Sequence, residues 1–194
     1  MTRTSSSDAE AEAIGTVAAL MAAGARTAPK TRGVDTILTM VVHGRELEEL
    51  AAAMEQVAAT KPEFRRAPIG KDAATVRRSG CVVLVGVVGV PKKPDRPFDC
   101  GACGFQTCSE LLSARLEEGG DFHGPVCVFA ALELGVALGS AVKIAADMNI
   151  DNRMMYTIGL AAMRLRWLEA DVIIGIPLSV AGKNIYFDRD THRG

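Results

Sequence analysis

The run CVVLVGVVGV, residues 81–90, constrains the fold more than any other stretch of the chain. It is almost unbroken in apolar side chains and rich in valine, a residue that favours strands. A strand that is apolar on both sides is buried on both faces of its sheet. Such a sheet needs a layer of helices on each side. We therefore predict an α/β or α+β fold, with one central sheet and helices on both faces.

Helical and extended patterns alternate around this strand. Apolar residues at strand or helix spacing predict two further strands, 36–43 and 171–177, and four helices, 8–28, 45–59, 129–148 and 154–168. The polar stretch 60–72 contains two prolines and a glycine and is typical of a loop, with a helical turn after it. Residues 106–118 predict one more helix. We expect a single domain over residues 1–194, with a disordered tail at 1–7 and a cysteine-bearing insert at about 95–128.

Four of the five cysteines follow the spacing C-x2-C-x4-C-x18-C, at Cys100, Cys103, Cys108 and Cys127. Four thiolates can hold one iron–sulfur cluster. Gly101 and Gly104 allow tight turns that bring backbone amides close to sulfur. Plant-type 2Fe–2S sequences place the longer gap before the shorter one, the reverse of this chain. The order of the gaps and the distant fourth cysteine favour a 4Fe–4S cluster.

Two other uses of these cysteines remain open. Structural zinc also takes four thiolates, but its sites usually consist of two short knuckles, whereas Cys108 and Cys127 lie far apart. A redox dithiol at Cys100 and Cys103 would need only the C-x-x-C pair. The fifth cysteine, Cys81, opens the valine run and is expected to act as a small hydrophobic residue.

Charge and composition argue against several classes of partner. The net charge of −1 and the low aromatic content, 5%, are unlike those of nucleic-acid-binding proteins. The stretch 126–146 is about as long as a membrane span, but Glu133 and Lys143 interrupt it, so we expect a buried helix and no membrane. The polar N-terminus and the odd cysteine count indicate a protein of the reducing cytoplasm.

A basic loop follows the first predicted helix. Arg26, Lys30 and Arg32 lie in ARTAPKTRGVD, residues 25–35, and could together clamp a phosphate. On the motif alone, a solvated basic loop is the favoured reading. In the long apolar helix, Gly135 and Gly139 lie four residues apart and would allow another helix to approach closely.

Several blocks of the sequence resemble a known family. These are ARTAPKTRGVD at 25–35, DCGACGFQTC at 99–108, DNRMMYTIGLAA at 151–162 and GIPLSVAGKNIYFDR at 175–189. They resemble the uncharacterised bacterial and archaeal proteins described as containing a ferredoxin domain, a family with no assigned reaction. Separately, CGACGFQTC with the distant Cys127 is similar to the small 4Fe–4S module of electron-transfer and corrinoid proteins.

The order of elements resembles a second group, the flavin-dependent nitroreductase-type folds. That resemblance implies bound FMN, with its phosphate held by Arg26, Lys30 or Arg32 and by Lys183. It also implies a homodimer, for which the Gly135/Gly139 helix is suited. Together these expectations describe a redox protein that passes electrons through a 4Fe–4S cluster. If the cluster delivers them to a bound FMN, the protein is a flavin-dependent oxidoreductase. Its electrons would go to a partner protein or a small acceptor. The alternative is a metal- or cluster-binding structural protein without turnover.

Overall fold

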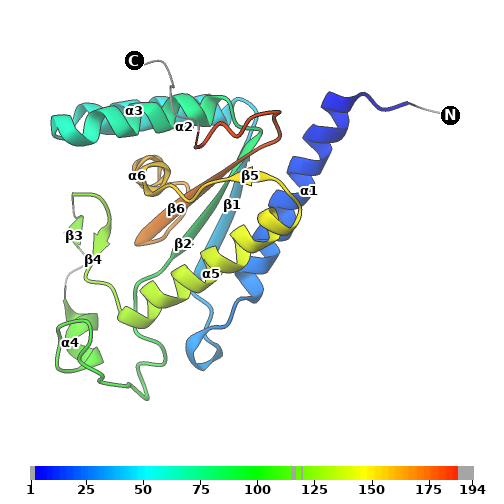
Figure 1. Ribbon diagram of the computed structural model, residues 1–194. Coiled ribbons are helices and arrows are strands. Elements are labelled where there is room, and N and C mark those ends of the chain that lie inside the picture. The colour runs from blue at the N-terminus through cyan, green and yellow to red at the C-terminus, as the bar shows by residue number, and fades with distance from the viewer. Residues whose placement is uncertain (1–2, 115–116, 119, 188–194) are drawn as a thin grey trace.

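The computed structural model of the chain describes residues 3–114, 117–118 and 120–187. An antiparallel sheet of four strands in the order β1-β2-β6-β5 forms its centre. Helices lie on both sides of this sheet (Figure 1). The strands are β1 (Ile37–His43), β2 (Cys81–Val87), β5 (Asp151–Asn152) and β6 (Val172–Ser179). The predicted fold class, one sheet covered by helices on both faces, is confirmed.

Strand β2 is the centre of the core, as its sequence predicts, because all of its residues are buried. Val83 and Val85 belong to the core on the side of α1 (Ser6–Thr27) and α5 (Val128–Asp147). Val82 and Leu84 belong to the core on the opposite side. There α2 (Glu46–Ala59) and α6 (Tyr156–Leu165) cover the sheet. The alternation of strand side chains thus divides one apolar run between two cores.

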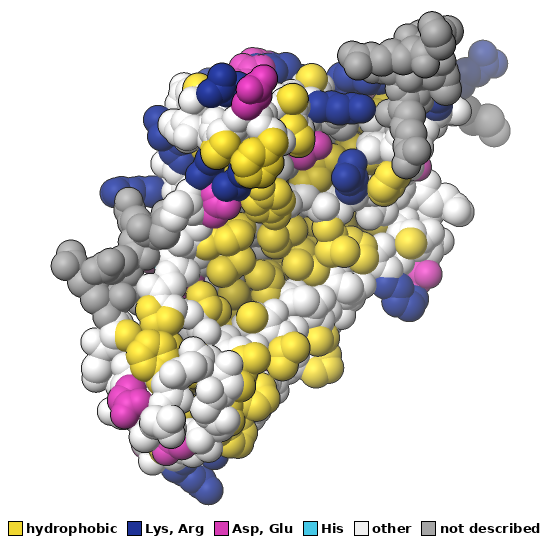
Figure 2. All heavy atoms as spheres, turned by 60° about the vertical axis from the view of Figure 1, so that its left-hand side comes forward, with side chains coloured by type: hydrophobic (Ala, Val, Ile, Leu, Met, Phe, Trp, Pro, Cys, Tyr) yellow, Lys and Arg dark blue, Asp and Glu magenta, His cyan; other side chains and the backbone are white. Residues whose placement is uncertain are grey.

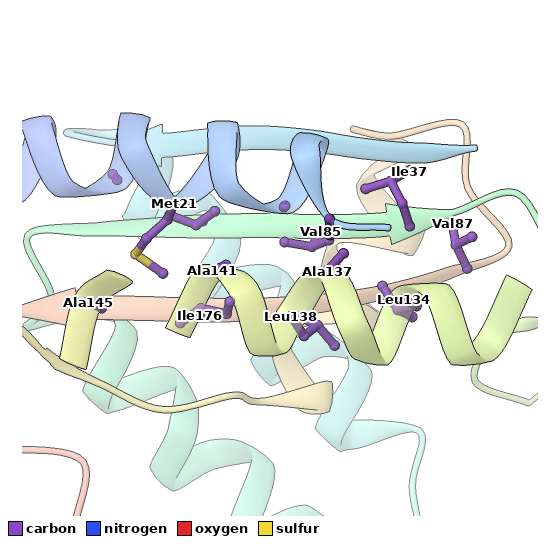
Figure 3. Packing of buried hydrophobic residues seen from close by; sticks show 14 of the residues in the cluster. Met21, Ile37, Val85, Val87, Leu134, Ala137, Leu138, Ala141, Ala145 and Ile176 are labelled. Atoms are coloured by element: carbon purple, nitrogen blue, oxygen red, sulfur yellow. The ribbon is translucent and has the colours of Figure 1, made fainter. Parts of the chain in front are cut away.

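Small residues allow α1 and α5 to pack closely over the sheet. Met21 of α1 and Ala137 and Ala141 of α5 lie against the strands near Val85 and Ile176 (Figure 3). All five side chains are fully buried. Burying a side chain as large as methionine or isoleucine contributes about 1.5–3 kcal/mol. This packing fixes the end of α1, from which the basic loop leaves.

The stretch 60–72 is not a loop, because α3 (Glu63–Arg77) runs through most of it. A proline and a glycine lie inside this helix and conceal it in the sequence. Its buried side chains, Ile69, Ala73 and Val76, recur at helical spacing and belong to the core shared with α2 and α6. Packing against neighbouring helices therefore overrides weak local propensity.

Helix α1 begins at Ser6, two residues earlier than predicted. The hydroxyl of Ser5 accepts a hydrogen bond from the Asp8 amide at 3.1 Å and caps the helix. The last two residues of the predicted tail are therefore helical. Residues 1–2 of that tail lie outside the described residues.

The insert after β2 holds less helix than predicted. Among the residues of the predicted helix 106–118 that the structure describes, α4 (Cys108–Ser113) is the helical part, and Glu117–Glu118 instead forms β3, which pairs with β4 (His123–Gly124). In Figure 1 β3 and β4 lie to the left of the sheet, and α4 lies below them. The chain returns at Cys127, whose amide donates to the Gly89 carbonyl at 2.7 Å. The two ends of the insert therefore meet where β2 leaves the sheet.

Helix α5 has the length and apolar composition of a membrane span. In this structure it packs along α1 and the sheet, and Glu133 in its first half is buried inside the protein. Its other face carries exposed apolar residues, including Leu132 and Val136, which are 58% and 46% exposed. Hydrophobic side chains also form a continuous band across the face of the molecule in Figure 2.

Candidate metal centre

The four cysteines of the spaced motif line one narrow cavity. Cys100, Cys103 and Cys108 come from the insert, and Cys127 precedes α5. Cys127 is buried, Cys103 and Cys108 are partly buried, and Cys100 is exposed. None of the four is in a disulfide. The rest of the wall is mainly apolar and consists of Pro91, Lys92, Phe98, Gly101, Phe105, Thr107, Leu111 and Phe129.

The turns between the first cysteines depend on glycine. Gly101 and Gly104 have φ angles of 71° and 90°, in the region that other residues rarely adopt. The Gly104 amide donates to the Gly101 carbonyl at 3.0 Å, which closes the turn around Cys103. The Asp99 carboxylate accepts a hydrogen bond from the Cys108 amide at 2.7 Å. This contact ties the two ends of the cysteine loop together.

Helix α4 fixes the third cysteine. Thr107 and Glu110 form a capping box, in which the Thr107 hydroxyl accepts from the Glu110 amide at 3.2 Å. The Glu110 carboxylate accepts from the Gln106 amide at 2.8 Å. Cys108 is therefore the first residue of a capped helix and lies in the cavity wall.

A buried carboxylate supports the fourth cysteine from behind. Asp171 Oδ2 accepts a hydrogen bond from the Gly89 amide at 2.6 Å. Gly89 in turn accepts from the Cys127 amide through its carbonyl, at 2.7 Å. A Cβ at Gly89 would lie 3.0 Å from Val126 and 3.2 Å from the Asp171 carboxylate. Asp171 therefore fixes the backbone from which Cys127 projects.

The four cysteines line one shared, narrow cavity. Within the described residues, no three His, Cys, Asp or Glu side chains are grouped closely enough to hold a single ion. Four cysteine thiolates are a ligand set that can hold an iron–sulfur cluster. The glycine turns, the free thiols and the apolar walls fit such a group. Their assignment as ligands stays a prediction.

The basic side chains of residues 25–35 contact a carboxylate of the same loop, that of Asp35. Arg26 Nη1 lies 2.5 Å from Asp35 Oδ2 and donates to the Ile37 carbonyl at 2.6 Å. Burial raises the pKa of the Asp35 carboxyl, but hydrogen bonds from Arg26 and from the Ile37 amide outweigh it and hold the pKa below its usual value. Lys30 is 7% exposed and donates to the carbonyls of Ala25 and Arg26, so it caps the end of α1.

Arg32 joins the basic loop to the wall of the cysteine cavity. Its guanidinium lies 4.5 Å from the centre of the Phe98 ring and donates to the Arg96 carbonyl. Phe98 packs against Phe129 with ring centres 5.2 Å apart, and both rings line the cavity. The structure thus brings together two motifs that are more than sixty residues apart in the sequence.

Lys183 lies at the other end of the sheet. Arg26 contacts Ile37, which pairs with Val87 at the end where β2 leaves the sheet. Lys183 follows Ser179, which pairs with β5 at the opposite end. One chain therefore brings Arg26, Lys30 and Arg32 together but does not bring Lys183 to them.

That opposite end also holds Cys81, which takes no part in the cavity. Cys81 is 2% exposed, and burial raises the pKa of its thiol to about 12. Nearby, the Tyr186 hydroxyl is hydrogen-bonded to Ser79 at 3.0 Å, and burial raises the pKa of this tyrosine to about 12. Cys81 is a buried apolar residue of the core, as the sequence predicts.

Sequence reasoning missed the residues that support the cavity. In the sequence, Asp171 only begins a predicted strand, and no pattern marks Lys92. The one signal available was Glu133, an isolated carboxylate in an apolar helix that must find a partner if it is buried.

Comparison with solved structures places the fold in the nitroreductase-like class. A nitroreductase-like family protein from Bacillus cereus matches with a TM-score of 0.55 and 12% identity, over 95% of this chain and 90% of the other. A nitroreductase with bound FMN from Desulfitobacterium hafniense gives 0.51 and 14%, over 94% and 81%. The NADPH:FMN oxidoreductase of Vibrio harveyi, complexed with NAD+, gives 0.51 and 11%, over 89% and 60%. At these identities the likeness concerns the fold.

The sequence itself defines the family more narrowly. Residues 123–189 match the family described as uncharacterized protein containing a ferredoxin domain (DUF2148). An uncharacterized protein of Archaeoglobus fulgidus is 45% identical over 184 residues, which is 94% of this chain and 95% of the relative. The chain belongs to this family of ferredoxin-domain proteins. The matched segment contains Cys127 but not the three earlier cysteines of the motif.

Proposed function

We propose that this protein carries electrons through a 4Fe–4S cluster held by Cys100, Cys103, Cys108 and Cys127. The observation that supports this most is that these four free thiols line one cavity. A bound cluster would supply one-electron redox chemistry. The chain would supply the four thiolates, and Phe98, Phe105 and Phe129 would limit the access of water. The family description, a ferredoxin domain, agrees with this role.

The proposal extends to an FMN bound beside the basic loop. The nitroreductase-like fold supports it, since FMN is bound in the Desulfitobacterium structure. In this chain the phosphate would go to Arg32 and to Arg26, whose side chain is 49% exposed despite its pairing with Asp35. The Lys30 side chain is 7% exposed and is engaged at the end of α1. The contact of Arg32 with Phe98 would keep the flavin close to the cysteine cavity. Electrons would then pass to a redox partner protein or a small acceptor in the reducing cytoplasm.

Lys183 would join this site only from a second copy of the chain, so the flavin half of the proposal includes a homodimer. The exposed face of α5 supports such an interface, because a Cβ at Gly135 would meet nothing within 4 Å. Replacing Gly135 by Arg should therefore leave the subunit folded and abolish dimers measured by light scattering. Gly15→Arg in α1, another exposed glycine with open surroundings, is the matched control and should leave dimers intact.

Purification without oxygen, followed by iron, sulfide, zinc and flavin assays on one sample, tests the whole proposal. We expect iron and sulfide in equal amounts, with FMN. Iron and sulfide without flavin would remove the flavin half. Stoichiometric zinc without sulfide would replace the redox function by the alternative, a structural metal-binding protein.

A further inference from the structure

A buried ion pair borders the cysteine cavity. Lys92 Nζ lies 2.9 Å from Glu133 Oε2, and the two side chains are 1% and 4% exposed. Lys92 also donates to the Thr36 hydroxyl, and Glu133 Oε1 accepts from the Thr31 amide at 2.8 Å. Within the described residues, Glu133 Oε2 makes no aligned hydrogen bond, so the charge of Lys92 is its compensation.

A buried ion pair of this kind contributes little net free energy to folding. Removing two charges from water costs several kcal/mol for each ion, and apolar residues of similar size often serve the fold as well. Helix α5 contains an ordinary pair for comparison. Lys143 and Asp147 are one helical turn apart and are 73% and 53% exposed, so water screens their attraction.

The two members of the buried pair differ in their position relative to the cysteine cavity. Lys92 is part of the cavity wall, whereas Glu133 is not. Of the two charged residues, the positive one is therefore the one that borders the cavity lined by the four cysteines. Four thiolates carry negative charge, and in a site of low dielectric a neighbouring ammonium stabilises further negative charge strongly.

We propose that Lys92 raises the reduction potential at this cavity, and that Glu133 is the positioning residue that holds the ammonium there and moderates its effect. This inference rests on the proposed function, a cluster bound by the four thiolates. In the step concerned, one electron from an external reductant enters the site. No bond is made or broken, and no proton moves, so the site becomes one charge more negative. The ammonium of Lys92 favours this reduced form.

The test is a redox titration of anaerobically purified protein with dithionite, followed by visible absorbance and electron paramagnetic resonance. Lys92→Met should shift the reduction equilibrium about tenfold toward the oxidised form, or about 59 mV lower for one electron. Glu133→Gln should shift it in the opposite direction, because Lys92 is then less compensated. Lys92→Arg should restore the native value to within about twofold, since it keeps the charge.

Two further variants keep the test decisive. Lys143→Met removes a lysine from α5 at an exposed pair, and it should leave the potential unchanged. Lys92→Met/Glu133→Gln leaves no buried charge unpaired, so it should fold even if Lys92→Met does not. Its potential should lie below the native value but above that of Lys92→Met.

A merely structural pair would give a different pattern. Loosening the cavity by either substitution would shift the potential in the same direction, and that result would overturn the inference while leaving the proposed function intact. Shifts in the predicted opposite directions, with unchanged iron and sulfide content, support it. Native protein without iron and sulfide would overturn both the inference and the proposed function.

Discussion

The two ends of strand β2 hold cysteines of opposite character. Cys81 begins the strand, and the apolar core around it raises its pKa to about 12. Cys127 lies beside the exit from the strand, next to a cavity that three other thiols share. Both are buried, at 2% and 6% exposure. Burial alone therefore does not decide what a cysteine does. What distinguishes the surroundings of Cys127 is the shared cavity, with its glycine turns and the buried charge of Lys92.

The largest contrast should appear in bound iron. Cys127→Ala is expected to lower the iron content of anaerobically purified protein by about tenfold or more, because even a change outside the ligand set can cost 10–100-fold in metal affinity. Cys81→Ala is the matched control, since it truncates an equally buried thiol. It should leave iron and sulfide unchanged. Equal losses in the two variants would show that iron content reports only on packing.

Alkaline pH should lower the stability of the protein through Cys81 and Tyr186, which lie at the start of β2. The folded state raises the pKa of Cys81 from 9.0 to about 12 and that of Tyr186 from 10.0 to about 12. Unfolded chains thus lose these protons first, so the free energy of unfolding should fall as pH rises from about 9 to 12. Chemical denaturation across this range measures it. Cys81→Ala should flatten the curve, and an unchanged slope would contradict this account.

Substitutions at Asp171 and Tyr186 distinguish a residue that supports the cysteine cavity from one that supports only the fold. Asp171→Ala leaves the Gly89 amide without its acceptor and should cost about 2 kcal/mol of stability, with loss of iron. Tyr186→Phe removes one buried hydrogen bond at the other end and should cost about 1 kcal/mol. Denaturation and iron assays on both variants check this. Loss of iron in Tyr186→Phe would show that the two ends are coupled.

The smallest effect concerns acid pH at the basic loop. Because Arg26 and the Ile37 amide hold the pKa of Asp35 below its usual value, its contribution is present above pH 4 and is lost as pH falls below about 4. The pair is partly exposed, so Asp35→Asn should cost less than about 1 kcal/mol at pH 7. Thermal melts should differ between this variant and the native protein at pH 7, and the difference should shrink as the pH falls below about 4.

The sequence predicts those parts of the fold that depend on local pattern. The apolar run of β2 indicates its burial on both faces, and the cysteine spacing indicates which four thiols share a cavity. Helix α3 escapes prediction because Pro68 and Gly70 weaken its pattern, while its packing partners lie in other helices. The Gly89–Asp171 contact spans 82 residues, and no local pattern carries such a pairing. Supporting residues are therefore the part that only the folded chain reveals.

The contact between the Cys127 amide and the Gly89 carbonyl has a consequence for how the insert is held. Since it places the two ends of the insert side by side, the insert leaves and rejoins the scaffold at one point. The contact of Arg32 with Phe98 ties the insert to the scaffold a second time. An insert held at two separate places has less freedom to move relative to α5 than one held only at its ends.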